Sequence, residues 1–98
     1  MNVELKKEGS KLIITPKESI DSKTSPDLEK VVNEAIDGSV TELEFLMGDV
    51  DFISSAGIRA LLSFRKKIGD GKVTLVSINN SIKEVLKLSS LFDYFTIC

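Results

Sequence analysis

The sequence predicts one α/β domain over residues 1–98, built from a mixed sheet of four to five strands and three to four helices. Three observations support this class. The 98 residues suffice for a single hydrophobic core. The composition is 42% apolar and 29% charged, which is the balance of a globular chain. Strand-like and helix-like stretches alternate in the order β-β-α-β-α-β-α-β, which implies parallel strands joined by helices after an initial hairpin.

The expected strands are short runs of alternating or continuously apolar residues. Residues 3–5 and 11–15 pair as a hairpin. Residues 42–47 begin with alternation and end in a continuously apolar stretch, so we expect a central strand that is covered on both faces. Residues 73–78 form a further strand, and residues 94–97 close the sheet.

The first expected helix covers residues 26–37. Ser25 offers a hydroxyl group for the N-cap, and Pro26 suits the first helical position. Gly38 is a natural stop after the last turn. The apolar residues recur at helical spacing and predict one buried stripe, formed by Leu28, Val31, Val32, Ala35 and Ile36.

Two further helices are expected at residues 56–68 and 81–90. The inner face of the second helix is formed by Ile58, Leu61, Leu62 and Ile68, and its outer face by Arg59, Ser63, Lys66 and Lys67. The third helix begins with Ser81 and Glu84, which have the spacing of a capping box.

The composition excludes several classes of function. The chain has no histidine, which removes the common general acid and base, the Ser-His-Asp triad and most zinc sites. The single cysteine, Cys98, cannot form an intrachain disulfide, and this fits a cytoplasmic protein. The net charge of −2 argues against nucleic-acid binding. The apolar runs are too short for a membrane span. We therefore expect a protein that is not an enzyme and that needs no cofactor or metal.

Chemistry is expected around Ser54 and Ser55, where a strand-like segment leads into the second helix. Ligand sites gather at the carboxyl ends of parallel strands, and the N–H groups that begin a helix attract anions. A phosphoryl group on either serine would meet a receptive environment. The alternative is that one serine caps the helix and the other fills space, while Gly57 allows close packing.

The same segment, Phe-Ile-Ser-Ser-Ala-Gly-Ile-Arg at residues 52–59, resembles the signature loop of the STAS domain, the fold of bacterial anti-sigma factor antagonists. The resemblance implies that Ser55 is the phosphorylation site. A second segment, residues 19–28, resembles the family motif before the first helix, with Asp21 and Thr24 at the aspartate and hydroxyl positions. The order of strands and helices also matches the family over nearly the whole chain.

Two positions depart from the family pattern. The glycine that usually precedes Leu-Asp in the second motif is absent, and Ser19 stands before Ile20 and Asp21. Many members carry Asp or Asn in the strand before the serine loop, where this chain has Leu46. The first departure affects a loop that would touch a partner, and the second removes a polar group near the end of the sheet.

The resemblance implies a switch that binds proteins and is itself not catalytic. Its partners would be an anti-sigma factor with serine-kinase activity, which phosphorylates Ser55, and a phosphatase, which restores the hydroxyl group. The implied binding residues are Asp21, Thr24, Ser54, Ser55, Gly57 and Arg59. One alternative is a STAS accessory subunit of a transport system that is not phosphorylated. Another is a sensor of small molecules or nucleotides, which is disfavoured because the sequence has no glycine-rich phosphate loop.

Other polar clusters are interpreted as surface features. Residues 69–72 lack the ending of a phosphate loop and are expected to form a surface turn. Asp49 and Asp51 have no third metal ligand nearby and are expected to be loop carboxylates. Residues 65–67 form a small basic patch that is either a solvated helix face or a contact for an acidic partner.

Overall fold

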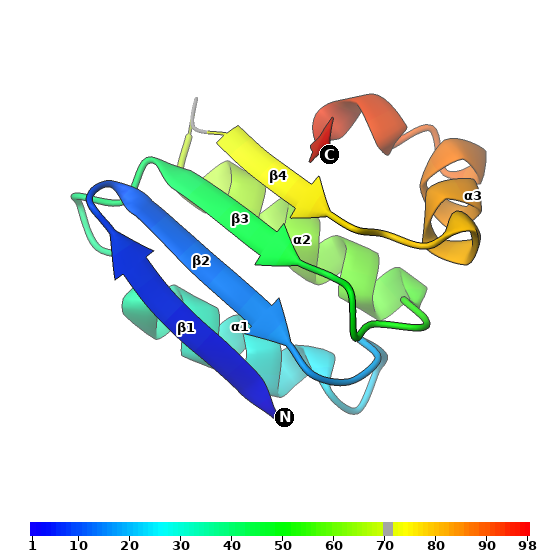
Figure 1. The fold of residues 1–98 in the computed structure, drawn as a ribbon, viewed down its shortest axis with the longest axis horizontal. Coiled ribbons are helices and arrows are strands. Elements are labelled where there is room, and N and C mark those ends of the chain that lie inside the picture. The colour runs from blue at the N-terminus through cyan, green and yellow to red at the C-terminus, as the bar shows by residue number, and fades with distance from the viewer. Residues whose placement is uncertain (70–71) are drawn as a thin grey trace.

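A computed structural model of the chain describes residues 1–69 and 72–98 and has the predicted order of elements (Figure 1). The elements are β1 (Val3–Glu8), β2 (Lys11–Pro16), α1 (Ser25–Ala35), β3 (Glu42–Leu46), α2 (Ser55–Lys67), β4 (Lys72–Val76), α3 (Asn80–Leu88), the short 3-10 helix η1 (Phe92–Tyr94) and β5 (Thr96–Ile97). The predicted α/β class, with five strands and three helices, is confirmed. The turn expected at residues 69–72 includes residues 70 and 71, which lie outside the described residues.

The five strands form one mixed sheet in the order β1-β2-β3-β4-β5. The hairpin strand β1 is antiparallel to β2, and every other pair is parallel. The expected central strand is therefore confirmed as β3. Because β2, β3 and β4 run in the same direction, the segments that follow them emerge at one edge of the sheet (Figure 1). This carboxyl edge carries the segments in which chemistry was predicted.

Helices α1 and α2 lie behind the sheet in the view of Figure 1, whereas the near face is open. Burial alternates along β3 accordingly: Leu43 and Phe45 are buried, whereas Glu44 and Leu46 are partly exposed. The prediction that this strand is covered on both faces is wrong. The sequence is continuously apolar here because Leu46, on the open face, is itself apolar. It is followed by Met47, which lies in the core just beyond the end of the strand.

The core fills the space between the covered face of the sheet and the helices. Phe45 of β3 stacks on Phe64 of α2, with ring centroids 5.8 Å apart and the planes inclined by 16°. Offset aromatic pairs of this kind add about 0.5–1.5 kcal/mol beyond the burial of their area. The other largest fully buried side chains are Ile14, Ile20, Leu28, Leu43, Met47, Ile53, Leu61, Leu75, Ile82 and Leu86. Phe64 was missing from the predicted inner face of α2, whereas Leu62 and Ile68 are partly exposed.

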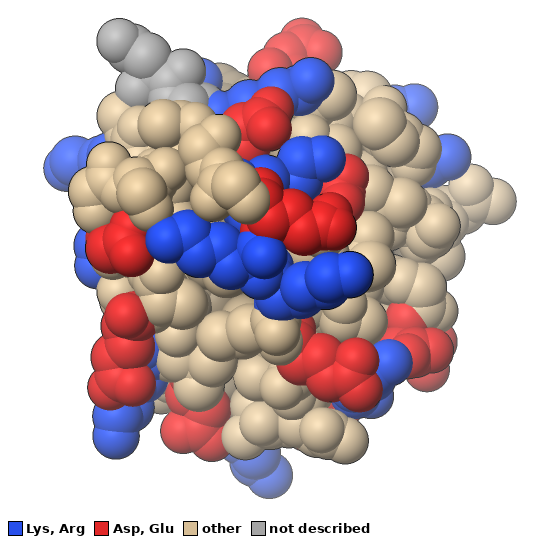
Figure 2. All heavy atoms as spheres, turned by 60° about the vertical axis from the view of Figure 1, so that its left-hand side comes forward, with Lys and Arg blue, Asp and Glu red and all other residues tan. Residues whose placement is uncertain are grey.

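The open face begins with charged residues at the end of the molecule where β2, β3 and β4 start. Glu8, Lys11, Glu42 and Lys72 are successive neighbours across four strands and alternate in sign. Figure 2 shows acidic and basic side chains interleaved on this side of the molecule. The outermost strand, β1, is exposed at five of its six residues.

The predicted beginning of α1 needs a correction. The helix starts at Ser25, so this residue is the first helical residue and not the N-cap, and it is buried with 5% of its surface exposed. Thr24 occupies the N-cap position without a side-chain cap bond. The N–H groups of the preceding turn are instead satisfied by Asp21. The helix ends at Ala35, because Ile36 adopts an extended conformation before Gly38 is reached.

The ends of the other helices also differ in detail from the predictions. Helix α3 is capped by Asn79, whose side-chain oxygen accepts a hydrogen bond from the N–H group of Ile82 at 2.9 Å. The predicted capping box of Ser81 and Glu84 is therefore wrong, because the chain turns into the helix before it reaches Ser81. The strand expected at residues 94–97 is shortened to β5 by the 3-10 helix η1. No helix among the described residues has the length and apolar character that a membrane span requires.

Gly57, in the first turn of α2, is buried where this helix approaches the segment around Ile20. A Cβ atom on Gly57 would lie 2.7 Å from Cγ1 of Ile53, 2.8 Å from Cγ2 of Ile20 and 2.8 Å from the carbonyl oxygen of Ile20. Ordinary carbon contacts are separated by about 3.5–4.0 Å. One of the three neighbours is a backbone atom that cannot rotate away. Helix α2 reaches this position because residue 57 has no side chain.

The substitution Gly57→Ala should lower the free energy of unfolding by about 1–3 kcal/mol, because the added methyl group forces α2 away from Ile20. Urea denaturation followed by circular dichroism measures this change. Gly48→Ala is the matched control, since a Cβ atom there meets nothing within 4 Å. The control should stay within about 1 kcal/mol of the wild type. A Gly57→Ala variant as stable as the wild type would contradict the close contact.

Candidate functional site

Two loops at the carboxyl edge of the sheet are joined through their backbones. The loop after β2 and the loop after β3 meet in a parallel bridge between Ile20 and Ile53. The N–H group of Ile20 donates to the carbonyl oxygen of Phe52 at 3.0 Å, and the N–H group of Ser54 donates to that of Ile20 at 2.9 Å. Both Ile20 and Ile53 are fully buried. The two loops in which the sequence predicted site residues are thus held side by side.

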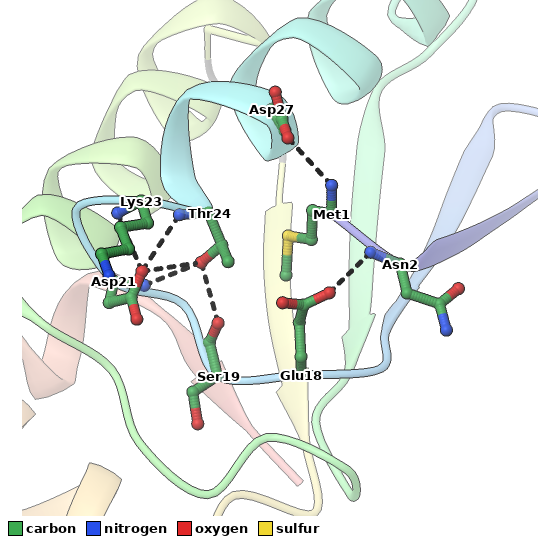
Figure 3. Close-up of polar contacts among 8 residues, drawn as sticks. All are labelled: Met1, Asn2, Glu18, Ser19, Asp21, Lys23, Thr24 and Asp27. Atoms are coloured by element: carbon green, nitrogen blue, oxygen red, sulfur yellow. Dashed lines mark hydrogen bonds and ion pairs between the residues drawn. The ribbon is translucent and has the colours of Figure 1, made fainter.

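Asp21 and Thr24 order the first of these loops (Figure 3). The carboxylate oxygen Oδ1 of Asp21 accepts hydrogen bonds from the N–H groups of Lys23 at 2.8 Å and Thr24 at 3.0 Å. The hydroxyl group of Thr24 accepts from the N–H group of Asp21 at 2.9 Å and donates to the carbonyl oxygen of Ser19 at 2.8 Å. These bonds form a closed turn that leads directly into α1. Asp21, and not Ser25, therefore supplies the side-chain oxygen that accepts N–H groups just before α1.

The same hydrogen bonds stabilise the charged form of Asp21. The N–H groups of Thr24 and Lys23 lower the pKa of this carboxyl group below its usual value, and the Thr24 hydroxyl group and the charge of Lys23 contribute further. The loop therefore presents an ionised carboxylate whose second oxygen, Oδ2, points away from the turn (Figure 3).

The beginning of the chain supports this loop from the other side (Figure 3). The N–H group of Asn2 donates to Oε2 of Glu18 at 2.8 Å, and the carbonyl oxygen of Asn2 accepts from the N–H group of Lys17 at 2.9 Å. The amino group of Met1 lies 2.9 Å from Oδ2 of Asp27 in α1. The segment before Asp21 is thereby fixed between β1 and α1.

Ser54 and Ser55 have different environments although they are adjacent. Ser54 is the N-cap of α2, and its hydroxyl oxygen accepts a hydrogen bond from the N–H group of Gly57 at 3.3 Å. The prediction that Ser54 is the better candidate for the cap is confirmed. Ser55 is the first residue of α2 and is exposed. Within residues 1–69 and 72–98 its hydroxyl group has no hydrogen-bond partner, so it is available to an external group.

The structure brings the six predicted site residues into one region but gives them unequal access to solvent. Ser55 and Arg59 are exposed on α2, whereas Asp21, Thr24 and Ser54 are partly exposed. Gly57 is buried and can act only by allowing the two loops and α2 to approach one another. Because the hydroxyl group of Thr24 is used within its own loop, we assign it an ordering role.

Two residues at this edge were missed by the sequence analysis. Phe52 was given no role of its own from the sequence, and it is 50% exposed. In this loop the apolar residues Val50, Phe52 and Ile53 do not alternate regularly with polar ones. The sequence pattern therefore did not indicate that Phe52 would be exposed. Asn79 holds the same loop against α3, because its amide nitrogen donates to the carbonyl oxygen of Asp51 at 2.9 Å. An Asn directly before a helix was the available signal.

The arrangement offers recognition and modification chemistry. An exposed hydroxyl group and an exposed arginine on α2 lie at the same edge of the sheet as an ionised carboxylate, on loops that are joined by backbone hydrogen bonds. The described residues contain no group of three or more His, Cys, Asp or Glu side chains that could hold a metal ion. A shallow hollow on the open face lies away from Ser55, near the start of the strands, and is lined by Lys11, Glu42, Leu43, Glu44, Lys72, Thr74 and Cys98.

Three solved structures have a similar fold at low sequence identity. An anti-sigma factor antagonist from Mycobacterium paratuberculosis is 20% identical, with a TM-score of 0.85 over 98% of this chain and 83% of its own. The Bacillus cell fate determinant SpoIIAA in its phosphorylated form is 17% identical, with a TM-score of 0.77 over 99% of this chain and 91% of its own. The murine Slc26a9 anion transporter is 20% identical, with a TM-score of 0.72 over 90% of this chain and 15% of its own.

At these identities the likeness concerns the fold. No curated protein matches the chain significantly. The family model of the STAS domain, however, matches residues 2–98. That match includes both the loop that contains Ser55 and the loop ordered by Asp21. The chain belongs to the STAS domain family.

Proposed function

We propose that this STAS domain is a protein-binding switch of the anti-sigma factor antagonist type and that phosphorylation of Ser55 controls it. The observation that carries the proposal is the exposed hydroxyl group of Ser55 next to Ser54, whose hydroxyl group is occupied as a helix cap. A kinase can reach the hydroxyl group of Ser55 without disturbing the helix cap at Ser54. The likeness of the fold to that of SpoIIAA in its phosphorylated form supports the same assignment.

The proposed partner is an anti-sigma factor with serine-kinase activity, which supplies its own ATP and Mg²⁺. It contacts the loop ordered by Asp21 and Thr24, the loop that contains Ser54 and Ser55, and the outer face of α2 with Arg59. Gly57 is buried behind these parts, and its lack of a side chain allows them to pack closely together. A separate phosphatase restores the hydroxyl group. The domain itself contributes recognition and no catalysis, and the whole exchange takes place in the cytoplasm.

The phosphate would act at the contact surface and leave the fold intact. Phosphoserine carries a charge of about −1.5 to −2 at neutral pH. The first turn of a helix tolerates a negative charge, because its free N–H groups carry partial positive charge. The bound partner, in contrast, must desolvate and accommodate this charge in the middle of the interface. Coupling energies of about 1–3 kcal/mol, typical for such effects, change an affinity about 5- to 150-fold.

A second candidate function is that of an accessory STAS domain of a transport system, without phosphorylation. The fold similarity to the murine Slc26a9 anion transporter favours this candidate, although the chain covers 15% of that protein. Ser19 and Leu46 also favour it, because both depart from the residues that the family pattern usually has at these positions. Mass spectrometry of the protein isolated from its own cells separates the two functions, since the switch requires a phosphorylated fraction.

We expect this mass spectrometry to find phosphate on Ser55 and not on Ser54. With the purified kinase partner, Ser55→Ala should fold normally, bind the partner and accept no phosphate. Ser55→Asp should bind about 5-fold or more weakly, because it places a charge in the interface. Phosphate on Ser54 alone would overturn the assignment. A Ser55→Asp variant that binds as tightly as the wild type would do the same.

Ser54→Ala should lower the free energy of unfolding by about 0.5–2 kcal/mol through loss of the helix cap, and it should still be phosphorylated on Ser55. Urea denaturation measures the first effect, and kinase labelling measures the second. Ser54→Asp is the control that restores a capping oxygen, and its stability should return towards that of the wild type. If Ser54→Ala were fully stable but could not be labelled, the roles of the two serines would be exchanged.

Asp21 should make the stability of the domain depend on pH in the acidic range. Its pKa is lowered in the folded state, so its contribution is complete above the unfolded pKa of about 4 and is lost as the pH falls through the folded value. Between pH 7 and pH 3, Asp21→Asn should therefore lose less stability than the wild type, as measured by urea denaturation. Asp21→Ala should be less stable at pH 7 as well, because it removes the oxygen that orders the loop. Equal losses in Asp21→Asn and the wild type would contradict this role.

A further inference from the structure

Arg59 lies one helical turn after Ser55 on the exposed side of α2. The helix is continuous from Ser55 to Lys67, and both residues are exposed. Side chains four residues apart on a helix are neighbours, with Cβ atoms about 5–6 Å apart. The long arginine side chain can therefore reach a group attached to the Ser55 hydroxyl.

The guanidinium group of Arg59 has no ion-pair or hydrogen-bond partner within residues 1–69 and 72–98. Helix α2 contains no acidic residue, so no carboxylate on the same helix competes for this cation. Two of the other three basic residues of α2 are engaged elsewhere. Arg65 lies over the ring of Tyr94 at 5.1 Å from its centroid, and Lys67 donates to the carbonyl oxygen of Asn33 at 3.2 Å.

The order of the two residues favours an ion pair once Ser55 is phosphorylated. An anion four residues before a cation is the more stabilising of the two arrangements on a helix. Guanidinium groups also bind phosphate oxygens through two parallel hydrogen bonds, which a lysine cannot do. The unmodified Ser55 hydroxyl group carries no charge and leaves Arg59 free.

We infer that Arg59 is the intramolecular counter-ion of a phosphate on Ser55. This inference rests on the proposed function and adds a mechanism to it. Phosphorylation then changes the exposed face of α2 in two ways, because it adds negative charge and also withdraws the Arg59 guanidinium group from external carboxylates. A partner that recognises the unmodified protein through an acidic group loses this contact when the phosphate appears.

The test uses protein in which phosphoserine is incorporated at position 55 during translation, so that no kinase is required. A ³¹P NMR titration gives the second pKa of the phosphate, which is about 6 in free phosphoserine. Removing the counter-ion with Arg59→Gln should raise this pKa by about 0.2–0.4 pH unit, since a helical ion pair of usual strength corresponds to that shift. Arg59→Lys should recover part of the difference.

Lys66→Gln is the matched control because it removes the same charge from the same helix. Lys66 is exposed and eleven residues from Ser55, which places it about 16 Å further along the helix axis. That distance exceeds the screening length at physiological salt, so the pKa of the phosphate should stay at the wild-type value. Equal pKa values in the Arg59→Gln and Lys66→Gln proteins would overturn the inference.

A second measurement covers the case in which the phosphorylated variants fold poorly. In unphosphorylated protein, Ser55→Glu places a carboxylate at the same position, and its urea midpoint should fall further in combination with Arg59→Gln than with Lys66→Gln. Equal midpoints would again overturn the ion pair. The inference and the proposed function fail separately, because absence of phosphate from the native protein removes the switch while these pair measurements stay unchanged.

Discussion

Two backbone hydrogen bonds at Ile20 determine the arrangement of this edge of the domain. They join the loop after β2 to the loop after β3, and they form only because α2 approaches closely enough for its first turn to rest against Ile20. The approach in turn requires a glycine at position 57. A single missing side chain therefore aligns two segments that lie more than thirty residues apart in the sequence.

The same constraint explains why adjacent serines differ. The N–H group of Ser54 is bonded to Ile20, which fixes the extended backbone of this residue and turns its hydroxyl group towards the N–H group of Gly57. Ser55 is the next residue and already helical, so its side chain leaves the helix on the opposite, solvent side. Selectivity between two chemically identical hydroxyl groups thus comes from the path of the backbone.

The order of elements and the central strand could be predicted from the sequence, because apolar periodicity reports directly on burial. The caps of α1 and α3 could not. Ser25 and Ser81 have suitable hydroxyl groups, but the oxygen that accepts N–H groups just before α1 belongs to Asp21, and the cap of α3 is Asn79, which is held by a contact distant in sequence. Asn79, for example, is held by the carbonyl oxygen of Asp51, which no local pattern reveals.

The identity of the site residues was predicted more completely than their exposure to solvent. Spacing and family resemblance indicated which residues would gather at the carboxyl edge, and the structure places them there. Helical periodicity placed Arg59 on the outer face of α2, and a packing role was considered for Gly57, but the sequence pattern did not indicate that Phe52 is exposed. The open face of the sheet was also missed. Leu46 lies on this face between the buried residues Phe45 and Met47, so an apolar residue stands where an alternating strand would have a polar one.

The outermost strand, β1, has a consequence for the behaviour of the protein in a crowded cell. Its outer edge has unpaired backbone groups that could serve as a template for a strand of another chain. Four of its six residues are charged: Glu4, Lys6 and Glu8 lie on one face of the strand and Lys7 lies on the other. An incoming strand would have to desolvate these side chains, which protects the edge against amyloid-like association. The opposite edge is covered by β5, which has two residues and offers little backbone to pair with.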